Sequence, residues 1–593
     1  MCFPVEPRSM SSDATAGDMT EVADMESLRD DGRTVTMAGG RPVALFHHEG
    51  DVYAVDNRCP HMGFPLSKGS VEDGLLTCDW HHARFELSRG DTLDIWADDV
   101  QTFPTEVRDG AVYVDPDPEP DIPPETHWRN RLADGLAENL SLVTAKAILH
   151  LDALGEGFTT PVETAVDFGT TYRADGWGRG LTTLGAMANI YDDVGHDEKL
   201  RAMYVGVTEV ADNCAGEPPR FDQYALSNED LTKDRLKEWF RETCEVRDSN
   251  GAERCLRAAA NALPNEDLVE MLVAASTDHL YMNASHTLDF INKAVETLDH
   301  VGWEKRENVL ASTVDAITDA SRAEETSSWR KPTDVAEICF DAHDDLPEMV
   351  AAGAGKSWER PEGFVETLLS EDPSEIDEAL RDAVAAGATS EQLAHAVAVA
   401  AMRRVAHFST SNEFNDWNTV HHTFSYANAA ENLARRTDAD DVYKACWDGA
   451  MSVYLDRFLN QPRATLPTPG EGEDADPAEL RERLLDTFDE QGRVDEAAEI
   501  VGHHFDAGGD PAALMETMGE GLLREDAGFH TLQSVEAGFR QFELARTDEE
   551  RRLSLVAPAR YMAAHFPTRR EDEQTFEIAE RLMQGEKIHE ASD

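Results

Sequence analysis

Two short motifs near the N-terminus constrain the fold of this chain more than any other feature. Cys59-Pro-His61 and Cys78-Asp-Trp-His81 each contain one Cys and one His, and 16 residues separate them. Two thiolates and two imidazoles can bind a [2Fe–2S] cluster in which His replaces Cys on one iron. The same four side chains would also satisfy a zinc ion. The motifs therefore predict two facing loops with a metal centre between them.

The residues around both motifs resemble the Rieske ferredoxin family. The resemblance covers Cys-Pro-His-Met-Gly-Phe-Pro-Leu-Ser-Lys-Gly (59–69) and Cys-Asp-Trp-His-His-Ala-Arg-Phe-Glu-Leu-Ser-Arg-Gly (78–90). It implies a [2Fe–2S] cluster held by Cys59, His61, Cys78 and His81, with zinc as the lesser alternative. It also implies that residues 102–105 form a loop covering the cluster. Phe64 and Trp80 stand where high-potential Rieske proteins carry additional cysteines, so the resemblance is to the lower-potential branch that serves oxygenases and reductases.

The texture of the chain changes after residue 116. Short β-prone runs come first, separated by turn signals such as Asp109-Gly110, which is typical of a hairpin. A Pro- and Asp-rich stretch follows, and the remainder has apolar residues at helical spacing. We therefore predict a multidomain protein with a small all-β Rieske domain followed by a large all-α, helical repeat-like domain. The expected segments are a flexible N-terminus (1–19), the Rieske domain (20–116), a linker (117–126) and the helical domain (127–593), with a loop or subdomain break near 466–477.

The charge balance limits the partners and setting of the chain. It has 117 acidic and 53 basic residues, a formal net charge of −64, and the acidic residues are spread along the sequence. Concentrated salt would screen this self-repulsion, so we expect a halophile-type, high-salt cytoplasm. Nucleic acid is disfavoured as a partner because Lys and Arg clusters are absent. We see no signal peptide and no apolar stretch long enough to cross a bilayer, so no membrane association is expected.

Histidines recur at similar places in the helical region. His286-Thr-Leu-Asp-Phe-Ile-Asn-Lys-Ala aligns with His422-Thr-Phe-Ser-Tyr-Ala-Asn-Ala-Ala, and a looser third copy begins at His530. We expect His286 and His422 to be catalytic, because neutral imidazole suits a general base or metal ligand. A second metal of unknown identity could bind there, with Glu431, Glu536 or Asp289 as carboxylates. His279 is predicted to share a helix face with His286. The alternative is a duplicated helical hairpin in which these histidines only pack.

Two functions remain open from sequence. In the first, the protein is an oxygenase-like iron–sulfur oxidoreductase that takes electrons from an external reductase or ferredoxin and acts on a small-molecule substrate. The recurring His-headed helices resemble the questin oxidase-like family of ring-cleaving oxygenases, which implies the same class of reaction. In the second, the protein is a non-catalytic electron carrier or redox sensor whose helical domain is a scaffold for partner docking. No G-x-G-x-x-G turn follows a strand, so we expect no dinucleotide site on this chain.

Overall fold

The computed structural model describes residues 19–588 except 121, 229, 282–285 and 587. The predicted flexible N-terminus falls outside these residues apart from Met19. Contacts within the chain divide it into two units. The first unit comprises Met1–Asp134, Ala145–Leu151 and Glu577–Asp593, and the second comprises Gly135–Thr144 and Asp152–Phe576.

The first unit is built on antiparallel strands. Three small sheets have the orders β1-β10-β9, β2-β3-β4-β8 and β5-β6-β7. The strands are β1 (Thr20–Asp24), β2 (Arg33–Ala38), β3 (Arg41–His48), β4 (Asp51–Asp56), β5 (Ser70–Glu72), β6 (Leu75–Thr77), β7 (Arg84–Glu86), β8 (Thr102–Phe103), β9 (Thr105–Arg108) and β10 (Ala111–Val114), with α1 (Met25–Asp31) and η1 (Leu66–Lys68) between them. The Asp109-Gly110 turn joins β9 to β10, as predicted.

Strand β3 separates two apolar cores. Successive side chains of a strand point to opposite faces, so Val43 and Leu45 enter one core while Phe46 enters the other. The second core also contains Cys59 and Cys78. The predicted cluster loops are therefore anchored in a packed apolar layer rather than hanging from the sheet edge.

Helical residues complete the first unit. They belong to α2 (Pro124–Ala137), α3 (Ser141–Ala153) and α25 (Glu571–Met583). Helix α2 begins inside the predicted linker, because proline is tolerated in the first turn of a helix. Within this unit, Asp98 is buried between Arg131 of α2 and Lys146 of α3, at 2.8 Å and 3.2 Å. The β fold and these helical residues thus share a buried ion cluster.

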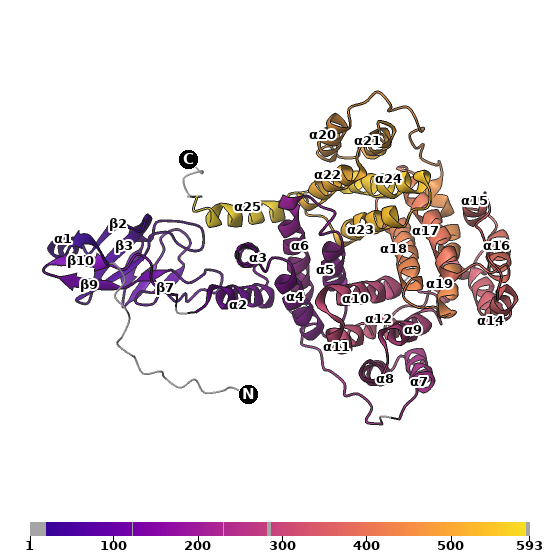
Figure 1. The fold of residues 1–593 in the computed structure, drawn as a ribbon, viewed down its shortest axis with the longest axis horizontal. Coiled ribbons are helices and arrows are strands. Elements are labelled where there is room, and N and C mark those ends of the chain that lie inside the picture. Colours follow the sequence, from indigo (N-terminus) through magenta and orange to yellow (C-terminus); the bar gives the residue numbers. More distant parts are fainter. Residues whose placement is uncertain (1–18, 121, 229, 282–285, 587, 589–593) are drawn as a thin grey trace. The chain divides into compact units, whose positions relative to one another are not determined.

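The second unit is helical, which confirms the predicted fold class (Figure 1). Its helices in the first half are α4 (Thr159–Thr171), α5 (Arg179–Asn189), α6 (His196–Cys214), α7 (Lys233–Glu245), α8 (Ser249–Ala262), α9 (Asn265–Ser276), α10 (Thr287–Val301), α11 (Arg306–Ala311), α12 (Asp315–Thr318), α13 (Ser327–Arg330), α14 (Val335–Gly353) and α15 (Phe364–Leu368). Those in the second half are α16 (Pro373–Ala385), α17 (Ser390–Ala406), α18 (Asp416–Ala434), α19 (Asp441–Leu455), α20 (Pro477–Phe488), α21 (Val494–Asp506), α22 (Pro511–Leu523), α23 (Phe529–Leu544) and α24 (Asp548–His565). Across the described part of the chain, no helix combines the length and apolarity that crossing a membrane would need.

Four helices near the middle of this unit form a closed ring. Helix α5 packs against α10, α10 against α18, α18 against α23, and α23 against α5 (Figure 1). Their sequences bury polar side chains as well as apolar ones, including Asp289, Lys293, His421 and Glu536. Because burying charged groups is costly unless they are paired, this ring is the part of the unit where a site is most to be expected.

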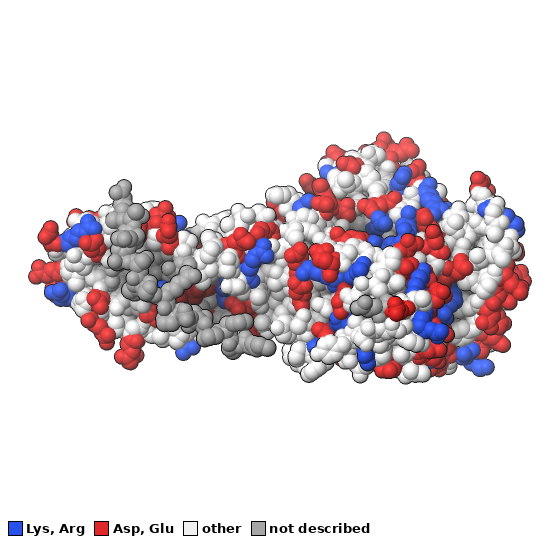
Figure 2. Space-filling model, turned by 60° about the horizontal axis from the view of Figure 1, so that its bottom comes forward, with Lys and Arg blue, Asp and Glu red and all other residues white. Residues whose placement is uncertain are grey.

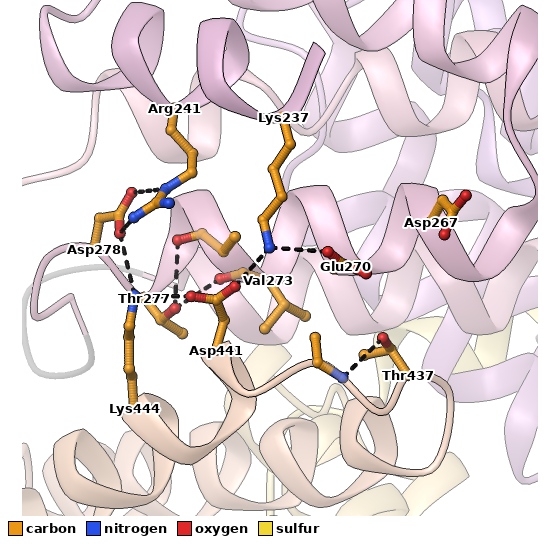
Figure 3. Close-up of polar contacts among 12 residues, drawn as sticks. Lys237, Arg241, Asp267, Glu270, Val273, Thr277, Asp278, Thr437, Asp441 and Lys444 are labelled. Atoms are coloured by element: carbon orange, nitrogen blue, oxygen red, sulfur yellow. Dashed lines mark hydrogen bonds and ion pairs between the residues drawn. The ribbon is translucent and has the colours of Figure 1, made fainter. Parts of the chain in front are cut away.

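Ion pairs join the helices that surround the ring. Lys237 of α7 bridges Glu270 of α9 and Asp441 of α19, at 2.9 Å and 2.7 Å (Figure 3). Burial would raise the pKa of Asp441, but the charges of Lys444 and Lys237 outweigh it and hold the pKa at about 2. Figure 2 shows many Asp and Glu side chains on the visible face, with Lys and Arg interspersed among them. The few cations are thus used in pairs with the abundant carboxylates.

Candidate metal centres

The two predicted cluster loops have matching backbone turns. In the first loop, the N–H of Cys59 donates to Phe64 O at 2.8 Å, and the N–H of Gly63 donates to Cys59 O at 2.7 Å. The second loop repeats this closing bond, from the N–H of His82 to Cys78 O at 3.0 Å. Gly63 and His82 both have positive φ, 78° and 62°. Each loop therefore turns back sharply after its Cys, which brings the following His near it.

The four predicted ligands meet where these loops face each other. Cys59 and Cys78 are both buried. Interaction between the two thiols lowers the pKa of Cys78 to about 6 and, with burial, raises the pKa of Cys59. The rings of His61 and His81 lie edge to face with centroids 4.8 Å apart. The fold thus brings together all four residues that the sequence singled out.

This donor set fits a [2Fe–2S] cluster. Nδ1 of His61 is buried and has no hydrogen-bond partner among the described residues, which is costly for a polar atom unless it binds a metal. Burial, the Lys146 charge and the neighbouring His81 lower the pKa of His61 to about 4. Burial and His82 lower the pKa of His81 as well. Burial thus favours the neutral form of both imidazoles, which is the form that binds a metal. A cluster held here would supply a one-electron carrier.

Aromatic rings enclose the two histidines. Trp96 packs edge-on against His61, and Trp80 lies against His81, with centroid separations of 4.7 Å and 4.2 Å. The rings of Phe64 and Trp80 are 5.9 Å apart. These two residues occupy the positions at which the sequence lacks the additional cysteines, and their packing links the two loops instead.

The loop beside the ligands lies earlier in the chain than predicted. Residues 102–103 form β8, which pairs with β4, and Phe103 belongs to the core on the other side of β3. In contrast, Ala97 and Val100 pack into the core that contains the cluster cysteines. The prediction that residues 102–105 cover the cluster is therefore wrong, because Phe103 is drawn into the sheet by its apolar side chain.

A buried lysine holds the first loop from outside. Nζ of Lys146 donates to Pro60 O at 2.6 Å, to His61 O at 3.1 Å and to Asp98 Oδ2 at 3.2 Å. Only 5% of its side chain is exposed. Asp98 also accepts from Arg131, as described above. The loop that carries two predicted ligands thus depends on a cation some 85 residues further along the chain.

A second constellation lies in the helical unit. One ring nitrogen from each of His286, His422 and His530 lies within 4.8 Å of the other two. Nε2 of His530 is 3.0 Å from Nε2 of His422 and 3.4 Å from Nε2 of His286. The three come from different members of the four-helix ring: His286 caps α10, His422 lies within α18, and His530 is in the first turn of α23. The structure thus adds His530, the head of the loosest repeat copy, to the two predicted residues.

Hydrogen bonds fix the orientation of these rings. Nδ1 of His286 lies 2.9 Å from Oδ2 of Asp289, one turn further along α10. The side-chain amide of Gln533 donates to the same carboxylate oxygen at 3.0 Å. The amide oxygen of Gln533 lies 3.3 Å from Nε2 of His421. Asp289 and Gln533 are buried, so packing limits the movement of both side chains.

The local environment keeps two of the three rings neutral. Burial, together with the neighbouring histidines, lowers the pKa of His422 to about 3 and that of His530 to about 4. Burial alone would also lower the pKa of His286, but the Asp289 carboxylate outweighs burial and raises it. Asp289 thus distinguishes His286 electrostatically from its two neighbours.

A second polar layer follows within the same ring of helices. Nζ of Lys293 lies 2.7 Å from Oε2 of Glu296 and 2.7 Å from Oε1 of Glu536, and Asn189 of α5 donates to both carboxylates at 2.8 Å. Burial raises the pKa of Glu536, and the Glu296 charge adds to that rise. This layer opens to a cavity of about 260 Å³ whose lining includes Asn189, Glu296, His300 and Glu536.

The remaining candidates take other positions. Of the three carboxylates, Asp289 contacts the histidines, Glu536 belongs to the Lys293 layer, and Glu431 pairs with His395 at 3.0 Å. The prediction that His279 shares a helix face with His286 is wrong: α9 ends at Ser276 and α10 begins at Thr287. Residues 282–285 between them lie outside the described residues.

A comparison with known protein families identifies the N-terminal segment of the chain. The family model of the Rieske [2Fe-2S] domain matches residues 18–104. The ferredoxin subunit of 3-phenylpropionate/cinnamic acid dioxygenase from Photorhabdus laumondii is 40% identical over 12% of this chain and 70% of its own length. The ferredoxin component of the alkene monooxygenase system of Xanthobacter autotrophicus is 33% identical over 17% of this chain and 83% of its own length. The ferredoxin component of the naphthalene 1,2-dioxygenase/salicylate 5-hydroxylase systems of a Ralstonia species is 32% identical over 13% and 73%.

The matched residues 18–104 contain both Cys–His motifs, and each of these relatives aligns with less than a fifth of the chain. Motif, fold and relatives agree on the N-terminal domain and on electron transfer as its role. Through this domain, the chain belongs to the Rieske [2Fe–2S] family.

Proposed function

We propose that this protein is an oxygenase-like oxidoreductase that accepts electrons at its Rieske domain and uses them at the His286–His422–His530 site of its helical domain. The donor is an external reductase or ferredoxin, and the substrate is a small molecule. The relatives support an oxygenase system, because three of them are named as ferredoxin components of dioxygenase or monooxygenase systems. The setting is the high-salt cytoplasm of a halophile, which the net charge of −64 favours.

One observation carries the proposal: three histidines far apart in sequence turn their ring nitrogens toward one another. A purely structural role does not explain this arrangement, because apolar side chains of similar volume would usually stabilise the four packed helices at least as well. The same holds for the buried Lys293 layer beside it. Polar groups retained at this cost are typical of sites that bind or react.

The proposal is tested by following reoxidation of the cluster in a single turnover. Full-length protein in high salt is reduced, freed of reductant and mixed with dioxygen, and the visible spectrum of the cluster is recorded over time. If electrons leave through the histidine site, His286→Ala combined with His422→Ala slows reoxidation at least about tenfold and leaves the spectrum of the oxidised cluster unchanged.

The matched control is His196→Ala, because His196 is an exposed histidine at the start of α6 in the same unit. This variant is expected to reoxidise at the wild-type rate. Equal rates in all three proteins would remove the helical site from the electron path and favour an electron carrier or redox sensor with a helical scaffold.

A further inference from the structure

We propose that His286, His422 and His530 bind one divalent first-row transition metal ion through their Nε2 atoms. This inference deepens the proposed function and rests on it for the role of the metal, although the binding itself is argued from geometry alone. The ion would form a second metal centre in the chain, distinct from the two irons of the Rieske domain.

The spacing of the ring nitrogens is that of ligands around one ion. Imidazole nitrogens bind a metal such as zinc at about 2.0–2.1 Å, so two of them in a tetrahedral site lie about 3.3 Å apart. The separations between His530 Nε2 and its two neighbours, 3.0 Å and 3.4 Å, match this value. All three atoms lie within 4.8 Å of one another, so a small movement of one ring completes the set.

The carboxylate beside His286 selects the atom that faces the metal. When Nδ1–H of His286 donates to Asp289, the proton is held on Nδ1 and the lone pair of Nε2 is directed at the other two histidines. Metal-bound histidines commonly donate their second nitrogen to a carboxylate in this way. Gln533 in turn donates to Asp289, so the carboxylate is itself held in place. His286 therefore has the outer contacts of a metal ligand.

The donor type indicates the class of metal. Three imidazole nitrogens suit iron, copper, nickel, cobalt or zinc, whereas Mg²⁺ and Ca²⁺ prefer oxygen ligands. Three protein ligands leave at least one coordination position for a small molecule, as catalytic sites require. The His286 side chain is 22% exposed, so the three-histidine site is not sealed from solvent.

The experiment is a titration of full-length, cluster-loaded protein with Co²⁺ in high salt, followed by calorimetry and by elemental analysis after desalting. Wild type is expected to retain one cobalt for every two irons, and Mg²⁺ is expected not to displace it. His286→Ala, His422→Ala and His530→Ala should each weaken binding by more than about 100-fold. Asp289→Asn should weaken it by about 10–100-fold, as loss of an outer contact does.

His196→Ala serves as the matched control and should bind cobalt like wild type. Because a variant could lose its fold, each one is first compared with wild type by circular dichroism and by its cluster spectrum. Electron paramagnetic resonance of the Cu²⁺-loaded wild type gives a second measurement, in which hyperfine splitting from three imidazole nitrogens is expected. A wild type that retains no cobalt, or a His530→Ala variant that retains it fully, would overturn the inference.

These outcomes separate the metal site from the proposed function. Cobalt binding that depends on the histidines, combined with cluster reoxidation that does not, would leave the metal site and remove the electron path. The opposite combination would leave the electron path and remove the metal.

Discussion

Replacing Lys146 by Met should destabilise the Rieske domain and its cluster. The change keeps the length of the side chain but removes a buried ammonium that serves Pro60 O, His61 O and Asp98. Breaking a buried ion pair costs about 3–5 kcal/mol, and an unsatisfied buried acceptor costs about 1–3 kcal/mol. Because Asp98 keeps Arg131, we expect a loss near the lower end, about 3 kcal/mol.

The loss of stability is measured by heating the protein and following the visible circular dichroism of the cluster to its thermal midpoint. For a unit of this size, about 3 kcal/mol lowers the midpoint by roughly 6–12 °C. The reduction potential should also fall, because a positive charge beside the cluster favours the reduced form. Lys146→Arg should restore most of both properties. The control is Lys199→Met, whose lysine pairs with a solvent-exposed Asp192. A midpoint and potential for Lys146→Met equal to those of this control would refute the reasoning.

Three further predictions concern other parts of the molecule. Gly90 has φ 83°, and a Cβ at this position would lie 1.9 Å from Val100 O, so Gly90→Ala should lower the free energy of unfolding by more than about 2 kcal/mol and reduce the cluster content. Gly40 also has positive φ but has open space around it, so Gly40→Ala should cost only the backbone strain of about 1–2 kcal/mol. Burial lowers the pKa of His279, but hydrogen bonding to Glu324 outweighs burial, and the net pKa is raised. The stability that protonated His279 contributes to the fold is therefore complete below the unfolded pKa and is lost as pH rises through the folded pKa. His279→Gln should accordingly flatten the fall of the thermal midpoint above neutral pH. The midpoint of the whole chain should fall when salt is lowered from about 1 M to 0.1 M, because the Debye length grows from about 3 to 10 Å; an unchanged midpoint would contradict the self-repulsion argument.

The Rieske domain was predictable because its signals are local. Each motif supplies one Cys and one His at a fixed spacing, so Cys59, His61, Cys78 and His81 stand out in the sequence itself. The change from β-prone to helical texture likewise follows from periodicity within short windows. The loop at 102–105 was misplaced because burial of Phe103 in a sheet is decided by tertiary packing, which the motif does not encode.

The helical site was only half predictable. The repeat indicated His286 and His422, but the third copy, which begins at His530, is too divergent to be recognised with certainty from sequence. The three histidines come together only because α18 packs against both α10 and α23. The expectation for His279 failed because a helical spacing says nothing when the helix ends between the two residues. Lys146 and Asp98 carried no signal at all, since their pairing depends on contacts 48 residues apart.

The most direct test of this account is a complete metal and acid-labile sulfide analysis of the full chain, purified in high salt. We expect two sulfides and two irons per chain, plus close to one further transition metal ion. In a variant with His286, His422 and His530 all replaced by Ala, the sulfides and two irons should remain and the further ion should be lost. The same metal content in both proteins would contradict the histidine site, and zinc without sulfide would contradict the Rieske cluster.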